Sequence, residues 1–586
     1  MKVSIAFSWP AWTWVNTAWL LLWNLLSSKW YFVLGDKEYA SIIKWDNNDF
    51  ILYISDQNFF ISNKLDYFFA QDDYSISKNE KIYELKNIHN FKSSDCKYKN
   101  TYSFWASLKV LWISLDEWKA LINENFKNKE SLAQNLIDLE NWYNYISNPD
   151  LPAGRQGFDL SKNIWNPKEF KFWNQIIGEW AMASWLEWYS AYPMTPASSL
   201  IDVIVPYSVI STEAEKSLKS DLSTSSRWQV IFFQWEDEIA VAMSTLGAKF
   251  AGKRAMCWTS GWWFALMTES ISFSNQTEIW WVYILSQRDW PSTGTPTFTW
   301  QWDLKFTLTP TFWETAPIVV VPSTYEDWYN LIWKALNRSD IYQHPVIVLL
   351  DKQYSESYLS VENKDLKPEN INRGERLPLS HPEWNEGSRM IDNKNLDSSV
   401  TPQNDSLIWY KRYSFTDSWI SPYTVPGTEN GEFIATSYEH DEYWATNEEP
   451  AMKKQMMKKR FQKMETFIQK EFNSDFYGYE IINPEAKNFF ITFGFNRYVL
   501  EDYIKDKKDY GLIIIKVMQP FDLRLKTWLD ENQKNIKSLT FVGMNYAWQL
   551  QELVTNICLL NTPDRTKKIK NIRKYDLYPI FQEDIK

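Results

Sequence analysis

Between about residues 172 and 360, short apolar runs alternate with segments of helical character. The strand-like runs are IDVIVPY (201–207), RWQVIFFQ (227–234), RAMCW (254–258), WWVYIL (280–285), APIVVV (316–321) and HPVIVLL (344–350). Strands that alternate with helices favour a parallel sheet with helices on both faces. The pattern therefore predicts an α/β fold for the central part of the chain.

The sequence on either side of this region predicts two further α/β domains. The first begins with the strand-like KVSIAF, and the last contains FFITFGF, LIIIKV and LTFVGM. Non-periodic, Pro- and Gly-containing sequence separates the first two domains, as expected for a linker. The predicted boundaries are 1–147 (first domain), 148–170 (linker or insertion), 171–445 (second domain, with a polar surface insertion at about 361–406), 446–480 (charged helical connector) and 481–586 (third domain).

Tryptophan occupies positions where a turn or loop calls for glycine. The segments are SWPAWTWVNTAW (8–19), CWTSGWWFALMTES (257–270) and EIWWVYILSQRDWPSTGTPTFTWQWDLKF (278–306). Such loops need positive φ or close backbone approach, which glycine allows and a bulky ring does not. The chain has 35 Trp and only 16 Gly, whereas average usage would give a chain of this length about 41 Gly.

We therefore predict that many of these tryptophans are glycines encoded by UGA, in an organism that reads UGA as glycine. The prediction does not extend to every tryptophan. Trp118 and Trp142 lie in helix-like contexts (SLDEWKALI and ENWYNYI) and are expected to be genuine core aromatics.

Charge and cysteine spacing exclude several classes of protein. The net charge of −11 argues against a nucleic-acid binder, which would carry a basic domain. Cys96, Cys257 and Cys558 form no CxxC pair, and the four histidines form no metal or triad pattern, so we predict no metal site in this chain. The apolar N-terminal stretch is interrupted by polar residues, and no run reaches 18 apolar residues, so we expect a cytoplasmic protein without a membrane partner.

Several co-linear motifs resemble those of one enzyme family. They are YPMTPAS (192–198), QWEDEIAVAMSTLGAKFAG (234–252), residues 257–269 and 287–304, SWISPYTVPGTENG (418–431), YEHDEYW (438–444), QPFDLR (519–524) and NYAWQL (545–550). With glycine in place of most tryptophans, they resemble the α subunit of 2-oxoacid:ferredoxin oxidoreductases. Residues 1–147 resemble the γ subunit of the same enzymes, fused in front. The resemblance implies a γ-type domain, a pyrimidine-binding domain with a parallel sheet, and a C-terminal domain like that of transketolase.

The resemblance also implies a reaction and its partners. A 2-oxoacid, coenzyme A and oxidised ferredoxin would give acyl-CoA, CO₂ and reduced ferredoxin, with 2-oxoglutarate favoured and pyruvate possible. Thiamine diphosphate would be shared with a separate β subunit, which would carry Mg²⁺, a [4Fe–4S] cluster and the route to ferredoxin. The chain would then act only within a hetero-oligomer.

Three residues match the family's functional positions. Glu238 matches the carboxylate that hydrogen-bonds N1′ of the cofactor's aminopyrimidine and promotes removal of the C2 proton; without the resemblance it would be a helix-start acid. Thr195 and Arg288 match residues that hold the substrate carboxylate, a role suited to a guanidinium fork. Outside the family, Arg288 would form a surface ion pair and Thr195 would stabilise a turn. Asp303 and the turn Ser292–Gly294 are assigned no chemistry.

Three alternatives remain open at this point. A close one is an oxidoreductase subunit acting on indolepyruvate or a branched-chain 2-oxoacid. A distant one is a Trp-rich binding protein for sugars or membranes, whose tryptophans should lie on exposed faces rather than in turns. The third is an inactive relative, which the presence of Glu238, Thr195 and Arg288 disfavours.

Overall fold

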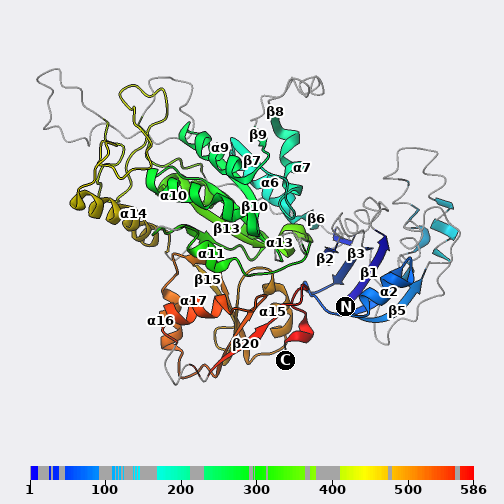
Figure 1. Cartoon of the computed structure of the whole chain (residues 1–586). Helices are drawn as coiled ribbons and strands as arrows, with labels where there is room; N and C mark the ends of the chain where they lie inside the picture. The colour runs from blue at the N-terminus through cyan, green and yellow to red at the C-terminus, as the bar shows by residue number, and fades with distance from the viewer. Residues whose placement is uncertain are drawn as a thin grey trace, which may run out of the picture.

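Three β-sheets organise the computed structural model. The structure describes residues 2–10, 26–27, 31–38, 47–90, parts of 109–144, 168–210, 230–289, 295, 297–311, 314–362, 370–377, 410–472, 478–560, 566 and 568–585. A seven-stranded sheet contains the N-terminal strands, an eight-stranded sheet lies in the middle, and a five-stranded sheet is formed near the C-terminus (Figure 1). In the described chain, no helix is both long and apolar enough to cross a bilayer.

The eight-stranded sheet has the strand order β18-β12-β13-β11-β10-β7-β9-β8. Every neighbouring pair is parallel except β12 and β18. This confirms the predicted α/β fold. The strands are β7 (Trp188–Ala191), β8 (Ser208–Ile210), β9 (Val230–Gln234), β10 (Ala255–Ser260), β11 (Val282–Gln287), β12 (Ile318–Val320), β13 (Val346–Asp351) and β18 (Val517–Gln519).

Helices cover both faces of this sheet, as β11 illustrates. Val282 and Ile284 belong to the core that includes helices α6 and α12, whereas Tyr283 and Leu285 belong to the core that includes α9 and α10. Because side chains alternate between the faces of a strand, a continuous apolar run is what a doubly covered strand requires. The helices are α6 (Trp173–Ala183), α9 (Glu238–Phe250), α10 (Thr268–Thr277) and α12 (Tyr325–Tyr342).

The seven-stranded sheet combines strands from two distant parts of the sequence. Its order is β5-β4-β1-β3-β2-β14-β6, and β14 pairs antiparallel with both β2 and β6. The last residues of the predicted linker, 168–170, belong to β6. The strands are β1 (Lys2–Pro10), β2 (Phe32–Glu38), β3 (Asn47–Ser55), β4 (Lys64–Ala70), β5 (Glu84–Asn90), β6 (Lys168–Phe172) and β14 (Tyr358–Glu362), and α2 (Asp73–Asn79) follows β4.

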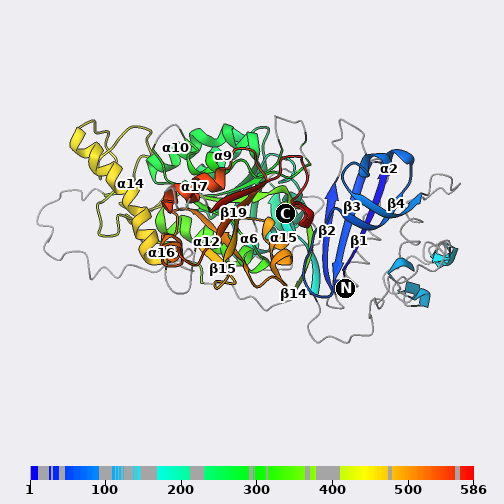
Figure 2. The ribbon, with the colours of Figure 1, turned by 90° about the horizontal axis from the view of Figure 1, so that it is seen from below.

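The five-stranded sheet has the order β15-β17-β16-β19-β20, with only β15 antiparallel to its neighbour. It contains the three strands predicted from FFITFGF, LIIIKV and LTFVGM. It lies below the central sheet in Figure 1 and in front of it when seen from below (Figure 2). Its elements are β15 (Tyr479–Ile482), β16 (Asn488–Thr492), α15 (Asn496–Ile504), β17 (Tyr510–Ile515), α16 (Arg524–Glu531), β19 (Ser538–Gly543), α17 (Gln549–Ile557), β20 (Ile569–Arg573) and η6 (Gln582–Asp584).

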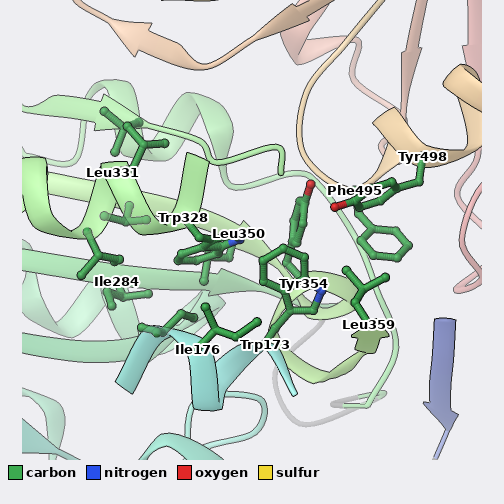
Figure 3. Packing of buried hydrophobic residues seen from close by; sticks show 14 of the residues in the cluster. Trp173, Ile176, Ile284, Trp328, Leu331, Leu350, Tyr354, Leu359, Phe495 and Tyr498 are labelled. Carbon is green, nitrogen blue, oxygen red and sulfur yellow. The ribbon is translucent and has the colours of Figure 1, made fainter. Parts of the chain in front are cut away.

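Aromatic side chains join the three sheets where they meet. Tyr354, in α13 (Lys352–Glu356), makes edge contacts with Trp173 at 5.0 Å and Phe495 at 5.2 Å between ring centroids (Figure 3). Tyr498 of α15 contacts Phe59, which follows β3, at 5.2 Å. Since such pairs contribute about 0.5–1.5 kcal/mol each beyond area burial, the junction is a packed core rather than a loose hinge.

A buried ion cluster holds the long helix α14 (Pro450–Glu471), which lies in the predicted charged connector, against the central part of the chain. Lys459 and Lys463 both donate to Glu278, which is 1% exposed and follows α10. The two ammonium groups keep the pKa of Glu278 well below its usual range despite burial, which acts in the opposite direction. Removing one partner of such a cluster typically costs about 3–5 kcal/mol.

One predicted strand is wrong. IDVIVPY forms helix α7 (Ser199–Ile204) and a 3-10 turn (Val205–Tyr207). Leu200 and Ile204, four residues apart, are its buried side chains, and this helical spacing outweighs the β-branched composition. The strand β7, which the sequence did not predict, instead begins at Trp188.

Several predictions concern residues outside the described part of the chain. They are residues 11–19 of the predicted Gly-rich turn, Trp142, the linker (148–167), the turn at 290–294 and most of the insertion (363–369 and 378–406). Trp9 and Pro10 of the predicted turn belong to β1. Trp118 is described, and at 1% exposure it is a core aromatic as predicted.

Candidate active site

Four neighbouring strands in the order β11-β10-β7-β9 end at one edge of the central sheet. Arg288 follows β11, Gly261 follows β10, Thr195 comes after β7 and Glu238 after β9. The chain order reverses between β7 and β10, and open α/β sheets bind ligands at such a switch point. At a spacing of about 4.8 Å between strands, the four loops span about 14 Å, which suits a small organic ligand.

Glu238 is the first residue of α9 and is only 3% exposed. Asp237 caps the helix by accepting from the backbone N–H of Ala240 at 2.8 Å, so Glu238 is not needed as the cap. The Oε1 atom of Glu238 is buried and has no hydrogen-bond partner among the described residues. Burial raises the pKa of Glu238 above its usual value, its own backbone N–H opposes the shift, and Asp237 adds to it. The buried carboxyl is therefore suited to a ligand with a nitrogen donor or acceptor.

Thr195 and Arg288 are brought together across the switch point. The Arg288 guanidinium donates to the backbone carbonyl of Thr195 at 2.8 Å. It also lies over the ring of Trp263, 4.3 Å from the centroid, which is cation–π geometry. Arg288 itself is 3% exposed. The contact with Thr195 uses the backbone and leaves the Thr195 side chain part-exposed.

A cavity of about 220 Å³ lies beside Arg288. Its lining consists of Gly261, Trp262, Arg288, Asp289, Trp302, Asp303 and Phe306. Gly261 has φ +39°, in the region that favours glycine, and a Cβ there would approach both Asp303 Oδ2 and Arg288 Cγ. Burial raises the pKa of Asp303 to about 7, against the opposing charge of Arg288.

A second, mainly apolar cavity of about 410 Å³ opens between α9 and α10. Ile239 and Met243 line it and are about half exposed, at 53% and 44%. Ile239 directly follows Glu238 at the start of α9.

The sequence prediction selected three residues at this edge and left out Asp303. Asp303, which follows Trp302 and precedes a short helix, was expected to shape the pocket mouth and was assigned no chemistry. Among the described residues, no group of three or more His, Cys, Asp or Glu side chains is arranged to hold a metal ion.

The part of the chain that contains these residues also resembles known proteins. Residues 180–459 match the protein-family model "Pyruvate flavodoxin/ferredoxin oxidoreductase, thiamine diP-bdg". The 2-oxoacid:ferredoxin oxidoreductase subunit alpha of Saccharolobus solfataricus is 28% identical over 503 residues, covering 83% of this chain and 70% of that protein. Subunit alpha of 2-oxoacid:ferredoxin oxidoreductase 2 from Aeropyrum pernix is 29% identical over 389 residues, covering 65% of this chain but 55% of that protein, less than two thirds of its length.

A solved structure matches the fold from end to end. It is a 2-oxoglutarate:ferredoxin oxidoreductase from Magnetococcus marinus with 2-oxoglutarate, coenzyme A and succinyl-CoA bound. The TM-score is 0.78 at 22% identity, and the match covers 100% of this chain and 98% of that chain. The likeness confirms the α/β fold with parallel-rich sheets.

Proposed function

Because this chain is a relative of the 2-oxoacid:ferredoxin oxidoreductase alpha subunits, we propose that it is the fused γ–α subunit of such an enzyme. The reaction is the CoA-dependent oxidative decarboxylation of a 2-oxoacid, with electrons passing to ferredoxin. One observation carries the proposal. Glu238, Thr195 and Arg288, the three positions that match family roles, all follow strands that end at one edge of one parallel sheet.

The buried carboxyl of Glu238 fits the pyrimidine half of thiamine diphosphate. The Oε1 atom of Glu238 has no protein partner among the described residues, and burial shifts the pKa of Glu238 upward, the direction that sharing a proton with a ring nitrogen requires. The cofactor, when bound, would supply a carbon nucleophile for the oxoacid. Glu238 would hold the proton at N1′, and helix α9, of which Glu238 is the first residue, fixes the position of the carboxyl. The diphosphate, Mg²⁺ and iron–sulfur groups are assigned to a β subunit.

Arg288 supports a carboxylate-binding role in the adjoining cavity. Its guanidinium is buried, fixed by the Thr195 carbonyl and positioned beside about 220 Å³ of space. An enclosed guanidinium interacts more strongly with a carboxylate than one in water does. Arg288 therefore orients the oxoacid by its carboxylate, and the Thr195 hydroxyl adds a donor. In this proposal 2-oxoglutarate is the favoured substrate and pyruvate is the second candidate.

The proposed reading of UGA as glycine is supported by backbone conformation. Among the described residues, ten that are not glycine have positive φ, and four of these are tryptophans: Trp185 (58°), Trp419 (62°), Trp444 (67°) and Trp548 (56°). For a residue with a Cβ, this region costs about 1–2 kcal/mol. Glycine at Trp262, Trp263 and Trp302 would also widen the cavity around Arg288.

The gene gives the direct test of this part of the proposal. UGA is expected at the four positive-φ tryptophan codons and in the loops around the site. The other codons expected to be UGA are those of Trp9, Trp12, Trp14, Trp258, Trp262, Trp263, Trp280, Trp290 and Trp302. UGG at most of these codons would refute it.

The enzymatic proposal is tested by reconstitution. The chain is co-expressed with the β subunit expected beside its gene, and 2-oxoacid-dependent reduction of ferredoxin is measured with thiamine diphosphate and coenzyme A. We expect turnover with 2-oxoglutarate or pyruvate that stops when coenzyme A is omitted. Preference for indolepyruvate or a branched-chain oxoacid would favour that alternative, and no turnover with any oxoacid would contradict the proposal.

A further inference from the structure

Asp303 is fixed beside Arg288 by a buried glutamine. The backbone N–H of Asp303 donates to the side-chain oxygen Oε1 of Gln287, the last residue of β11, at 3.0 Å. Gln287 immediately precedes Arg288, so one short stretch of chain places the acid and the guanidinium on the same cavity. Asp303 Oδ2 is enclosed and has no hydrogen-bond partner among the described residues.

Within the described part of the chain, few charges face this carboxyl. Arg288 lies across the cavity, and Asp289 beside it accepts a hydrogen bond from the Thr295 hydroxyl. Lys305, on the short helix that follows Asp303, is half exposed and pairs with Glu552 of α17. The remaining lining side chains, from Trp262, Trp302 and Phe306, do not titrate. Two acids thus share the cavity with one guanidinium.

We propose that Asp303 is a specificity-determining residue that takes up a proton when an anionic oxoacid enters the cavity. The protonated carboxyl then donates a hydrogen bond to the bound anion, next to Arg288. This inference rests on the proposed function, because it assigns the cavity to the oxoacid. It adds to that function a group whose protonation decides which charge the cavity accepts.

The charges determine whether affinity for the oxoacid rises or falls with pH. An ionised Asp303 repels a carboxylate, whereas a neutral one does not and offers a donor. Since burial raises the pKa of Asp303 to about 7, the proton is already present below that pH and must be taken up above it. Binding coupled to one proton weakens about tenfold for each pH unit above the pKa of the free site.

The experiment measures proton uptake directly in the complete complex with thiamine diphosphate. The probes are oxamate and N-oxalylglycine, unreactive analogues of pyruvate and 2-oxoglutarate that keep their charges constant near neutral pH. Titration calorimetry at pH 8 in phosphate and in Tris, whose ionisation enthalpies differ, counts the protons bound with each probe. We expect about 0.9 proton per site for the natural protein.

Asp303→Asn should abolish the uptake. Its amide keeps a donor at every pH, so the variant should bind both probes about tenfold more tightly than the natural protein at pH 8 and equally at pH 6. Asp289→Asn is the matched control, because it removes an acid from the same cavity and should leave the uptake intact. A thermal melt checks that both variants fold.

Three results would overturn the inference. They are probe binding by the natural protein without proton uptake, uptake that persists in Asp303→Asn, and uptake that is lost in Asp289→Asn alone. Failure of both probes to bind to any version would instead refute the carboxylate site of the proposed function, and the role of Asp303 with it.

Discussion

Glu238 and Arg288 follow different strands, and their proposed partners differ, the cofactor for Glu238 and the substrate for Arg288, so replacing each should change a different kinetic constant. Glu238→Gln keeps shape but removes the acidic proton from the buried site, so turnover should fall at least tenfold with little change in KM. Arg288→Ala removes a charged partner of the carboxylate, worth about 1.5–3 kcal/mol, so KM should rise about ten- to a hundredfold.

Steady-state kinetics of the reconstituted complex checks both values. Arg288→Lys is the matched control, because it keeps the positive charge but loses the two-pronged donor geometry of the guanidinium. Its KM should lie between those of the natural protein and Arg288→Ala. Wild-type kinetics in both variants would show that the site residues are misassigned.

At this scale the sequence indicated residue types but not their contacts. Glu238, Thr195 and Arg288 were selected by their motifs, whereas the bond from Arg288 to the Thr195 carbonyl joins residues 93 positions apart. Asp303 was passed over because its enclosure depends on Gly261, Gln287 and Phe306, which come from three separate segments. Burial of a loop acid is a tertiary property that no local pattern encodes.

At the scale of single elements, the residue that precedes a helix can test whether a tryptophan stands where the natural protein has glycine. Trp548 precedes α17 with φ 56° and is 41% exposed, and its ring packs against the Arg573 guanidinium 4.6 Å away. Trp548→Gly should raise the free energy of unfolding by about 1 kcal/mol, because glycine removes the strain of a Cβ at positive φ. Urea unfolding measures the change.

Two further variants control for the loss of the ring. Trp548→Ala retains a Cβ and should bring no such gain. Trp118→Gly empties a core position and should cost about 3–5 kcal/mol. Equal effects of Gly and Ala at position 548 would count against backbone strain as the cause.

The packing of α14 predicts a dependence of stability on pH. His344 is buried and lies 3.0 Å from the carbonyl of Arg460 on α14; burial first, then the charge of Lys463, lowers its pKa to about 3. Above pH 6.5, the ordinary pKa of histidine, the contribution of His344 to stability is fully present. Below that value the unfolded chain takes up a proton that the folded chain refuses, so stability falls progressively towards pH 3.

Between pH 6.5 and 5 this amounts to about 2 kcal/mol. Chemical denaturation at the two pH values should show the loss in the natural protein and a smaller loss in His344→Gln. An unchanged pH dependence in the variant would mean that His344 titrates normally.

Element types were predicted well where apolar runs were buried on both faces. Strands β9 to β13 follow from their composition, because a doubly covered strand needs an unbroken apolar run. Helix α7 was missed, since six residues with several β-branched side chains carry too little periodicity to separate helix from strand. Strands β6 and β14 were missed for another reason: their partners lie in a different part of the sequence.

At the scale of the whole molecule, the edge of the central sheet presents only half of the proposed active site. The purified chain alone should therefore neither decarboxylate 2-oxoacids nor reduce ferredoxin, and adding the β subunit should give both activities. Dye-linked and ferredoxin-linked assays on the chain, on the β subunit and on their mixture decide this. Turnover by the chain alone would contradict a divided site.

The placement of β14 has a consequence for synthesis on the ribosome. The strand β2 ends at Glu38, but its neighbour β14 ends at Glu362, about 320 residues later. At about 5–20 residues per second, the growing chain exposes one open side of β2 for roughly 15–65 seconds. During that time its unmet N–H and C=O groups are available to strands of other nascent chains. Faster translation, or a chaperone bound to β2 during this interval, should therefore reduce the fraction of the protein that aggregates.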